Sequence, residues 1–199
     1  MTQDEALTIL KTGGNVFLTG EPGSGKTHTI NTYVAWLRAR GIEPAITAST
    51  GIAATHIGGY TIHSWSGIGI KRNLSEEDLD QISQNKGVFK RVGDARTLII
   101  DEVSMLSART LTMVDAVCRE VRRDQRPFGG LQVILVGDFF QLPPVERAET
   151  RAENGSQTSV FGNQEARFAF SSPAWRRMEP LVCYLSEQHR QEDELFLGL

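Results

Sequence analysis

Residues 15–27 read "NVFLTGEPGSGKT", and the class of fold follows from them. A short run of strand-forming residues (15–19) leads directly into a Gly-rich turn, and the turn opens a helical pattern at Lys26. Strand, Gly-x4-Gly-Lys-Thr turn and helix in this order predict a phosphate-binding loop, because its backbone N–H groups and the positive helix end converge on phosphate oxygens. A Gly-rich turn arising by chance is the alternative, and the flanking strand and helix count against it.

The phosphate loop predicts a bound nucleotide, ATP, with Mg²⁺. Lys26 is expected to reach the β- and γ-phosphates, and the Thr27 hydroxyl to ligate the Mg²⁺ ion. Gln3 is either a contact to the adenine edge or an exposed polar residue in a fraying first turn. The nucleotide contacts that we expect along the loop are Gly20, Glu21, Pro22, Gly23, Ser24, Gly25, Lys26, Thr27 and His28.

Strand-like and helix-like patterns alternate along the rest of the chain. Near-continuous apolar runs predict further strands at 43–47, 97–101, 131–137 and 180–185, each buried on both faces. Helices are predicted from Thr2 to Gly13 or Gly14, from about 26 to 40, and from about 108 to 123 with Leu111, Val114, Cys118 and Val121 on one face. The alternation predicts an α/β fold with a parallel sheet flanked by helices.

Two polar stretches interrupt this alternation. Residues 68–93 lack a strand-like core run and contain a short helix that starts near Ser75, so we interpret them as an insertion. Residues 146–160 are predicted to form a solvated loop.

A pair of carboxylates ends the predicted strand at 97–101. Asp101 is placed to hold the Mg²⁺ shell, and Glu102 to polarise the attacking water as a general base. A merely polar strand terminus is the alternative. Gln141, beyond the next strand, is a candidate γ-phosphate sensor, and Arg190, beyond the last strand, is a candidate arginine finger. Parallel strands end on the same edge, so these residues are expected to meet.

The stretch "TASTGIAATHIGGYTIHSW" (47–65) suggests a second ligand, a nucleic acid. Small and hydroxyl residues admit a phosphodiester backbone, and a following aromatic residue stacks on bases. We expect phosphate contacts from Ser49, Thr50, Gly51 and Thr61, and a backbone or base contact from His63. An ordinary connection is the alternative, and for Trp65 we favour a place in the core.

A cluster of arginines lies between two predicted elements, and the whole chain is slightly acidic. The segment 119–126 is either a nucleic-acid patch or a solvated helix face; its arginines are Arg119, Arg122, Arg123 and Arg126. With 21 basic and 24 acidic residues, the formal charge of −3 argues against binding nucleic acid by bulk electrostatics.

The remaining composition argues against disulfides, a zinc site and a membrane anchor. Cys118 and Cys183 are expected to be buried free thiols, and His28, His56, His63 and His189 complete no zinc pattern with them. The first ten residues do not resemble a signal peptide, and no apolar run has the length of a membrane span. We expect a cytosolic protein, or a nuclear or organellar one if a further segment carries the address.

Five motifs in order resemble one known family. They are "GEPGSGKT", "TASTGIAATHIGGYTIHS", "IIDEVSML", "RPFGGLQVILVGDFFQLPPV" and "LSEQHRQ", and they run from Gln3 to Gln191 when the first helix is included. Together they resemble the Pif family (petite integration frequency) of 5′-to-3′ DNA helicases in superfamily 1B. The phosphate loop alone indicates a P-loop NTPase, whereas "PFGG" followed by "GDFFQLPPV" is much more specific.

The resemblance implies a RecA-like fold and ATP-driven movement along single-stranded DNA. It also implies unwinding of duplexes, forks and G-quadruplexes in genome maintenance, including repair, recombination and, in eukaryotes, telomere maintenance. By motif, Gln141 is the glutamine that couples nucleotide to DNA, Arg190 contacts the γ-phosphate, and the insertion at 68–93 is the small wedge domain 1B.

The resemblance also implies a second lobe. Family members continue into a second RecA-like domain (2A and 2B), so we expect this chain to be domains 1A and 1B, to be monomeric, and not to unwind DNA by itself. The competing hypothesis is a DNA-binding or assembly module that ATP switches without processive movement. A P-loop kinase is a weaker reading, since it leaves "GDFFQLPPV" unexplained.

The turn "GDFFQLPPV" (137–145) is expected to relay the state of ATP to the DNA. Pro143 and Pro144 hold the turn extended, so we place them at the DNA-facing edge. At least one of Phe139 and Phe140 is expected to pack in the core, and the sequence leaves open which.

Overall fold

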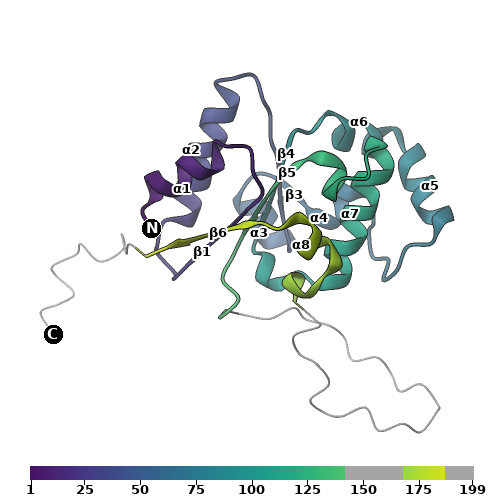
Figure 1. Cartoon of the computed structure of the whole chain (residues 1–199). Helices are drawn as coiled ribbons and strands as arrows, with labels where there is room; N and C mark the ends of the chain where they lie inside the picture. Colours follow the sequence, from purple (N-terminus) through teal and green to yellow (C-terminus); the bar gives the residue numbers. More distant parts are fainter. Residues whose placement is uncertain (142–167, 187–199) are drawn as a thin grey trace, which may run out of the picture.

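Parallel strands form one sheet across the described residues, 1–141 and 168–186, of the computed structural model (Figure 1). The strand order is β3-β2-β4-β5-β1-β6, and each printed pairing is parallel. All strands therefore end at one edge, which confirms the predicted α/β class. The strands are β1 (Val16–Gly20), β2 (Ala45–Ala48), β3 (Tyr60–Thr61), β4 (Thr97–Asp101), β5 (Gln132–Val136) and β6 (Leu181–Leu185).

The bounds of the five predicted strands agree with the structure to within two residues. Two other features differ from the prediction, the presence of β3 and the burial of β6. No pattern in the sequence indicates β3, since this strand is only two residues long at the edge of the sheet. The prediction of burial on both faces is wrong for β6. This strand pairs only with β1 in the described sheet, and it exposes Leu181, Val182 and Tyr184 while burying Cys183 and Leu185.

Helices cover both faces of the sheet, as predicted. In Figure 1, α1 and α2 lie on one side and α5, α6 and α7 on the other. None of the described helices is long and apolar enough to cross a membrane. The helices are α1 (Gln3–Leu10), α2 (Lys26–Arg38), α3 (Gly51–His56), α4 (Ile62–Ser66), α5 (Glu76–Gln84), α6 (Lys86–Asp94), α7 (Ala108–Arg122) and α8 (Pro173–Met178), with 3₁₀ turns η1 (Val103–Met105), η2 (Pro127–Gly130) and η4 (Ala169–Ser171).

The helix boundaries follow from local capping. Thr2 caps α1 through a capping box with Glu5, as its position before the helix predicts. The helix ends at Leu10, earlier than the predicted glycines, because Lys11 to Gly13 form a turn. The α2 helix ends at Arg38, two residues short of the prediction.

The alternation of side chains along the central strands divides the interior into two cores. On β4, Leu98 and Ile100 pack toward α4–α8, whereas Ile99 packs toward α1 and α2. The α7 residues predicted to share a face are all buried, and Trp65 is buried as favoured. Cys118 and Cys183 are buried free thiols, as predicted.

The polar stretch at 68–93 contains two helices. Ser75 caps α5, which confirms the predicted helix, and Asn85 caps a second helix, α6, that the sequence analysis missed. Ile82, Val88 and Val92 are buried in the same core as α7. The described part of this stretch thus shares the core of the sheet, and its assignment as domain 1B stays a prediction.

A buried carboxylate on α7 organises the "RPFGG" turn. Asp115 has no exposed surface; its Oδ2 accepts hydrogen bonds from Arg119 (3.1 Å) and Arg177 (2.6 Å), and its Oδ1 accepts the backbone N–H of Phe128 (2.8 Å). Phe128 is itself fully buried in a left-handed conformation with φ 52°. At Gly129, an added Cβ would lie 2.6 Å from the carbonyl oxygen of Cys118. The turn therefore fits tightly against α7 and sets the start of β5.

Three of the four arginines at 119–126 have intramolecular roles. Besides the Arg119 contact to Asp115, the Arg122 guanidinium donates to the carbonyls of Val92, Gly93, Ala95 and Gly129. Arg126 pairs with Asp124 on the surface. These bonds favour a structural role for this cluster over a nucleic-acid patch.

Replacing Asp115 by Ala should strongly destabilise the fold. The change leaves two guanidinium groups and the Phe128 N–H without their shared acceptor, and removing one partner of a buried ion pair typically costs about 3–5 kcal/mol. Equilibrium unfolding in urea measures this loss. The matched control is Asp124→Ala, where an exposed pair is lost and little change is expected. Equal unfolding midpoints for D115A and the unmodified protein would contradict the assignment.

Candidate functional site

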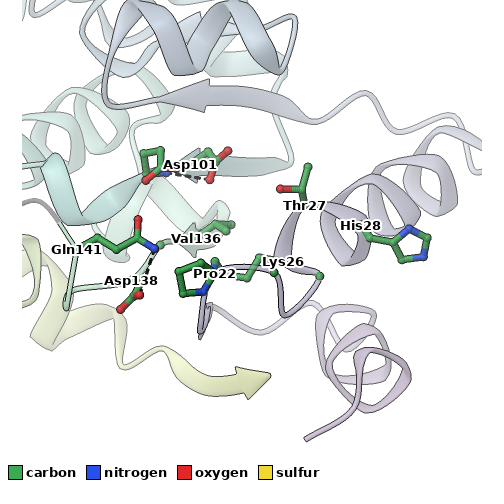
Figure 2. A pocket seen from close by; sticks show the side chains of 12 residues that line it. Pro22, Lys26, Thr27, His28, Asp101, Val136, Asp138 and Gln141 are labelled. Atoms are coloured by element: carbon green, nitrogen blue, oxygen red, sulfur yellow. Dashed lines mark hydrogen bonds between the residues drawn. The ribbon is translucent and has the colours of Figure 1, made fainter. Parts of the chain in front are cut away.

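The loops that follow β1, β4 and β5 enclose a cavity of about 410 Å³ at the carboxyl edge of the sheet (Figure 2). It is lined by the phosphate loop, by Asp101 and Glu102, and by the turn after β5. The sequence-predicted nucleotide residues that line it are Pro22, Gly23, Gly25, Lys26, Thr27, His28, Asp101, Glu102 and Gln141. Thus one cavity gathers the phosphate loop, the paired carboxylates and the sensor glutamine.

The phosphate loop depends on glycine at close-packed positions. Gly20 has φ 148°, and a Cβ there would lie 2.6 Å from the carbonyl oxygen of Leu185 on β6. Gly25, the N-cap of α2, has φ 88°, and a Cβ there would collide with the side chain of Gln3. The Gln3 amide lies 3.5 Å from the carbonyl oxygen of Ser24. Gln3 is therefore part of the loop's support, and its contact with adenine stays a prediction.

Lys26 and Thr27 open α2 at the floor of the cavity. The Lys26 ammonium donates to the carbonyl oxygens of Gly20 (2.7 Å) and Glu21 (3.0 Å), which holds the two ends of the loop together. Figure 2 shows Thr27 on the side of α2 that faces Asp101, whereas His28 points away from Asp101 and Gln141. His28 is exposed and lines the cavity, and its contact with the nucleotide stays a prediction.

Asp101 and Glu102 share a poorly solvated environment. Burial raises the pKa of Asp101, against the opposing effects of its hydrogen bond from the Glu102 N–H (2.9 Å) and of Lys26. Burial also raises the pKa of Glu102, and the neighbouring charge of Asp101 raises it further. A carboxylate with a raised pKa is a better base, which suits the role predicted for Glu102. Glu102 adopts φ 53°, a conformation that is costly outside glycine and is concentrated at functional sites.

The donors at this edge fit a Mg²⁺ ion that is completed by phosphate. A hydroxyl on Thr27 and a carboxylate on Asp101 are the hard oxygen ligands that Mg²⁺ prefers. No cluster of three or more His, Cys, Asp or Glu residues capable of holding a metal occurs within 1–141 and 168–186. Phosphate oxygens and water would therefore supply the remaining ligands, as is usual for Mg²⁺ at phosphate sites.

The turn after β5 is organised by Asp138, which the sequence analysis did not single out. Asp138 is buried; its Oδ1 accepts the backbone N–H of Phe140 (3.0 Å), and its Oδ2 accepts the Gln141 side-chain amide (3.2 Å). The Gln141 N–H also donates to the Asp138 carbonyl (3.1 Å). These bonds hold Gln141 at the cavity (Figure 2). The polar residue directly after a buried strand was the available signal.

Phe139 and Phe140 lie in different environments, which settles the alternative left open by the sequence. Phe139 packs among Phe17, Phe168, Phe170 and Trp175, with ring centroids 4.9–5.9 Å apart. Phe140 is 97% exposed. One ring anchors the turn to β1 and α8, and the other projects into solvent.

A second cavity, of about 570 Å³, adjoins the first. It shares Thr27, Asp101, Glu102 and Gln141 with the nucleotide cavity and extends to Thr50 and the exposed side of α3. Its further lining residues are Ile52, Ala53, His56, Ile57, Ser104 and Met105. The nucleotide cavity therefore shares wall residues with a second cavity that reaches the loop predicted to bind DNA.

The predicted DNA-contacting residues between 49 and 63 lie at or just beyond the ends of β2 and β3, at the same edge. Thr50 caps α3 by accepting the Ala53 N–H, and Thr61 caps α4 by accepting the Ser64 N–H. Gly51 is exposed at the start of α3, and Ser49 is buried with an unpartnered hydroxyl. Burial lowers the pKa of His63, which favours the neutral form of its ring. A contact from His63 would be made by hydrogen bonding or stacking.

Three predicted site residues cannot be placed. Pro143, Pro144 and Arg190 lie outside the described residues, and so does the predicted solvated loop at 146–160. Their roles stay predictions.

A model of the PIF1-like helicase family matches residues 4–195. The ATP-dependent DNA helicase Pif1 of Psychrobacter sp. is 53% identical over 193 residues, which are 96% of this chain and 27% of the relative. The crystal structure of Pif1 helicase from Candida albicans matches with a TM-score of 0.82 and 36% identity, over 98% of this chain and 41% of that one.

A further solved structure contains both classes of ligand predicted from the sequence. Pif1 helicase from Bacteroides in complex with ADP-AlF3 and ssDNA matches with a TM-score of 0.70 and 29% identity, over 98% of this chain and 43% of that one. The chain spans about a quarter of the length of the curated relatives it matches.

The two phenylalanines of the turn should differ sharply in their effect on stability. Phe139→Ala should lower the free energy of unfolding by about 3 kcal/mol, at the lower end for a buried Phe, because the ring cluster loses its centre. Phe140→Ala is the matched control and should leave stability unchanged, since its ring is almost fully exposed. Chemical denaturation of both variants measures the difference. Similar losses for the two would show that Phe140 is packed in solution.

Proposed function

The chain belongs to the PIF1-like helicase family, and from this premise we propose that it is the ATP-hydrolysing lobe of a 5′-to-3′ DNA helicase. The observation that carries the proposal is the shared lining of the two cavities. Thr27, Glu102 and Gln141 face both the phosphate loop and the side that leads to Thr50. Nucleotide chemistry and DNA contact would therefore meet across a single layer of side chains.

Hydrolysis on this proposal is a direct attack by water on ATP. Glu102 takes a proton as the water oxygen bonds to the γ-phosphorus, and the bond from that phosphorus to the bridging oxygen breaks to leave ADP and phosphate. Lys26, whose ammonium donates to the carbonyls of Gly20 and Glu21, would hold the β- and γ-phosphates when ATP binds. Mg²⁺, held by Thr27 and Asp101, would offset the phosphate charge.

The DNA would lie across the loops after β2, β3 and β5. Phosphates would be bound by Ser49, Thr50, Gly51 and Thr61. His63 would contact a base or the DNA backbone. The DNA-facing edge of the turn would be formed by Pro143 and Pro144. The acidic balance of the chain is compatible with such binding, since hydroxyls and backbone amides position phosphates without net charge. The Bacteroides relative bound to ssDNA supports this class of partner.

The turn after β5 is the proposed link between the two ligands. Asp138 bonds both to the Phe140 N–H and to the Gln141 side chain, so a movement of Gln141 toward a γ-phosphate would alter the bonds that hold the turn. Phe139 fixes the other side of the same turn to the core. Displacement would then be transmitted to the residues after Gln141.

The finer features of the proposal come from family membership. They are an arginine finger at Arg190, domain 1B at 68–93, a partner domain 2A and 2B, a monomeric state, and action on forked and G-quadruplex DNA in repair, recombination or telomere maintenance. The 199-residue chain tested without a second lobe should not unwind DNA, since movement needs two lobes that close around ATP. A cytoplasmic, nuclear or mitochondrial site of action is compatible with these features.

Replacing Glu102 by Gln tests the motor against the alternative, an ATP-switched binding module. In the full-length protein, E102Q should retain ATP binding and lose most ATP turnover, by about 100-fold or more, because the base is gone. Nucleotide affinity and phosphate release in the presence of single-stranded DNA measure both. Glu43→Gln, at an exposed pair with Arg38, is the matched control and should hydrolyse ATP normally. Unimpaired hydrolysis by E102Q would refute the catalytic role.

Replacing Gln141 by Ala should separate the two activities. Its amide loses the bond to Asp138, and the turn loses its connection to the nucleotide cavity. Basal ATP hydrolysis and the affinity for single-stranded DNA should each persist, whereas stimulation of hydrolysis by DNA should fall. Stimulation equal to that of the unmodified protein would rule out the relay.

A further inference from the structure

Among the described residues, the buried side-chain hydroxyls that lack a hydrogen-bond partner all lie at the carboxyl edge of the sheet. Of the serine and threonine residues that are buried there, most have hydroxyls bonded within the protein: Thr29, Thr47, Ser66, Thr97, Thr110 and Ser172. Ser24, Ser49 and Ser104 have none. These three follow β1, β2 and β4 respectively, so all lie at the carboxyl edge of the sheet.

An unpartnered buried hydroxyl is unfavourable and calls for an explanation, such as a ligand that completes it. Ser24 lies in the phosphate loop, and Ser49 in the loop proposed for DNA, so two of the three already belong to ligand-binding loops. Ser104 is the third, and neither the proposed hydrolysis nor the proposed DNA contact uses it.

Ser104 lies two residues beyond the proposed base, at a closely packed point of the chain. Glu102, with φ 53°, turns the chain out of β4 into η1, and Ser104 follows two residues later with 1% exposure. On the other side, the end of β5 packs closely, since a Cβ on Gly137 would lie 3.3 Å from the Ser104 nitrogen. Ser104 and Glu102 both line the second cavity.

We propose that Ser104 is a positioning residue for ATP hydrolysis, whose hydroxyl orients the attacking water toward Glu102. The inference rests on the proposed function. The water donates one hydrogen to the Glu102 carboxylate and the other to the Ser104 Oγ, which leaves a lone pair directed at the γ-phosphorus. When the oxygen–phosphorus bond forms, the proton passes to Glu102 and the bond to ADP breaks; Ser104 exchanges no proton.

The surroundings favour a water molecule over a DNA phosphate as the partner of Ser104. The Ser104 Oγ has almost no exposed surface, which excludes a bulky phosphodiester, whereas a turn of this short side chain toward the cavity would bring its hydroxyl to a single water molecule. The same cavity is also lined by Thr27, Asp101 and Gln141, so a water bound there would lie among the residues proposed to surround the γ-phosphate. A water molecule that bonds to Ser104 and Glu102 thus gains defined partners.

The test is Ser104→Ala in the full-length protein. No hydrogen bond of the free protein is lost, so the melting temperature without nucleotide should not fall. The kcat for ATP hydrolysis should fall about 10- to 100-fold with KM unchanged, as for the loss of a group that orients a reactant. Binding of a fluorescent ATP analogue should also be unchanged.

Ser66→Ala is the matched control. Its hydroxyl is equally buried but donates to the Ile62 carbonyl (2.7 Å) in α4, so this variant should lose some thermal stability and keep its kcat. Ser104→Cys, which keeps the size and only a weak hydrogen-bonding group, should recover part of the lost kcat.

The outcomes separate this inference from the function on which it rests. If the unmodified protein hydrolyses ATP, E102Q does not, and S104A has a normal kcat, the role of Ser104 is overturned and the proposed function stands. A lower melting temperature for S104A with a raised KM would indicate a structural role and would also overturn it. If the unmodified protein hydrolyses no ATP, both fail together.

Discussion

Every described strand of the sheet runs in the same direction, and the arrangement of the site depends on this constraint. Because β4 pairs with β2 on one side and β5 on the other, the chain segments after all three emerge together. The phosphate loop joins them through the pairing of β1 with β5. Thr27, Asp101 and Gln141 are distant in sequence, yet they line one cavity because the strands before them end at the same edge.

The register of the sheet is maintained by groups far from the cavity. Asp115 and Arg122 on α7 bind the turn that precedes β5, and Asn15 accepts the N–H of Val133 at the start of that strand while its amide donates to the carbonyl of Met178. The beginning of β5 is therefore fixed from two sides. Since a strand is stiff over five residues, fixing its start also fixes where Gly137 and Asp138 emerge beside the phosphate loop.

The parts of the structure that the sequence predicted are those with a local physical cause. The strand-loop-helix at 15–27, the caps at Thr2 and Ser75, and the apolar face of α7 each depend on neighbouring residues alone. The helix α6 was missed although Asn85 caps it locally, whereas the other missed features depend on contacts across the fold. The short strand β3 exists only because β2 lies beside it, the exposure of β6 follows from its place at the sheet edge, and the close packing of the Ser104 backbone involves Gly137.

The two most distinctive motifs of the chain illustrate why a specific signature does not by itself indicate a functional residue. In "PFGG", Phe128 is buried in a left-handed conformation, and Gly129 leaves room for the Cys118 carbonyl. Packing therefore explains why these two residues occur in the motif. In "GDFFQ", packing explains Phe139 and the buried Asp138, but it does not explain Gln141 or the exposed Phe140. What remains after packing has been accounted for is the part of a motif that a ligand must explain, and the same reasoning distinguishes Ser104 from Ser66.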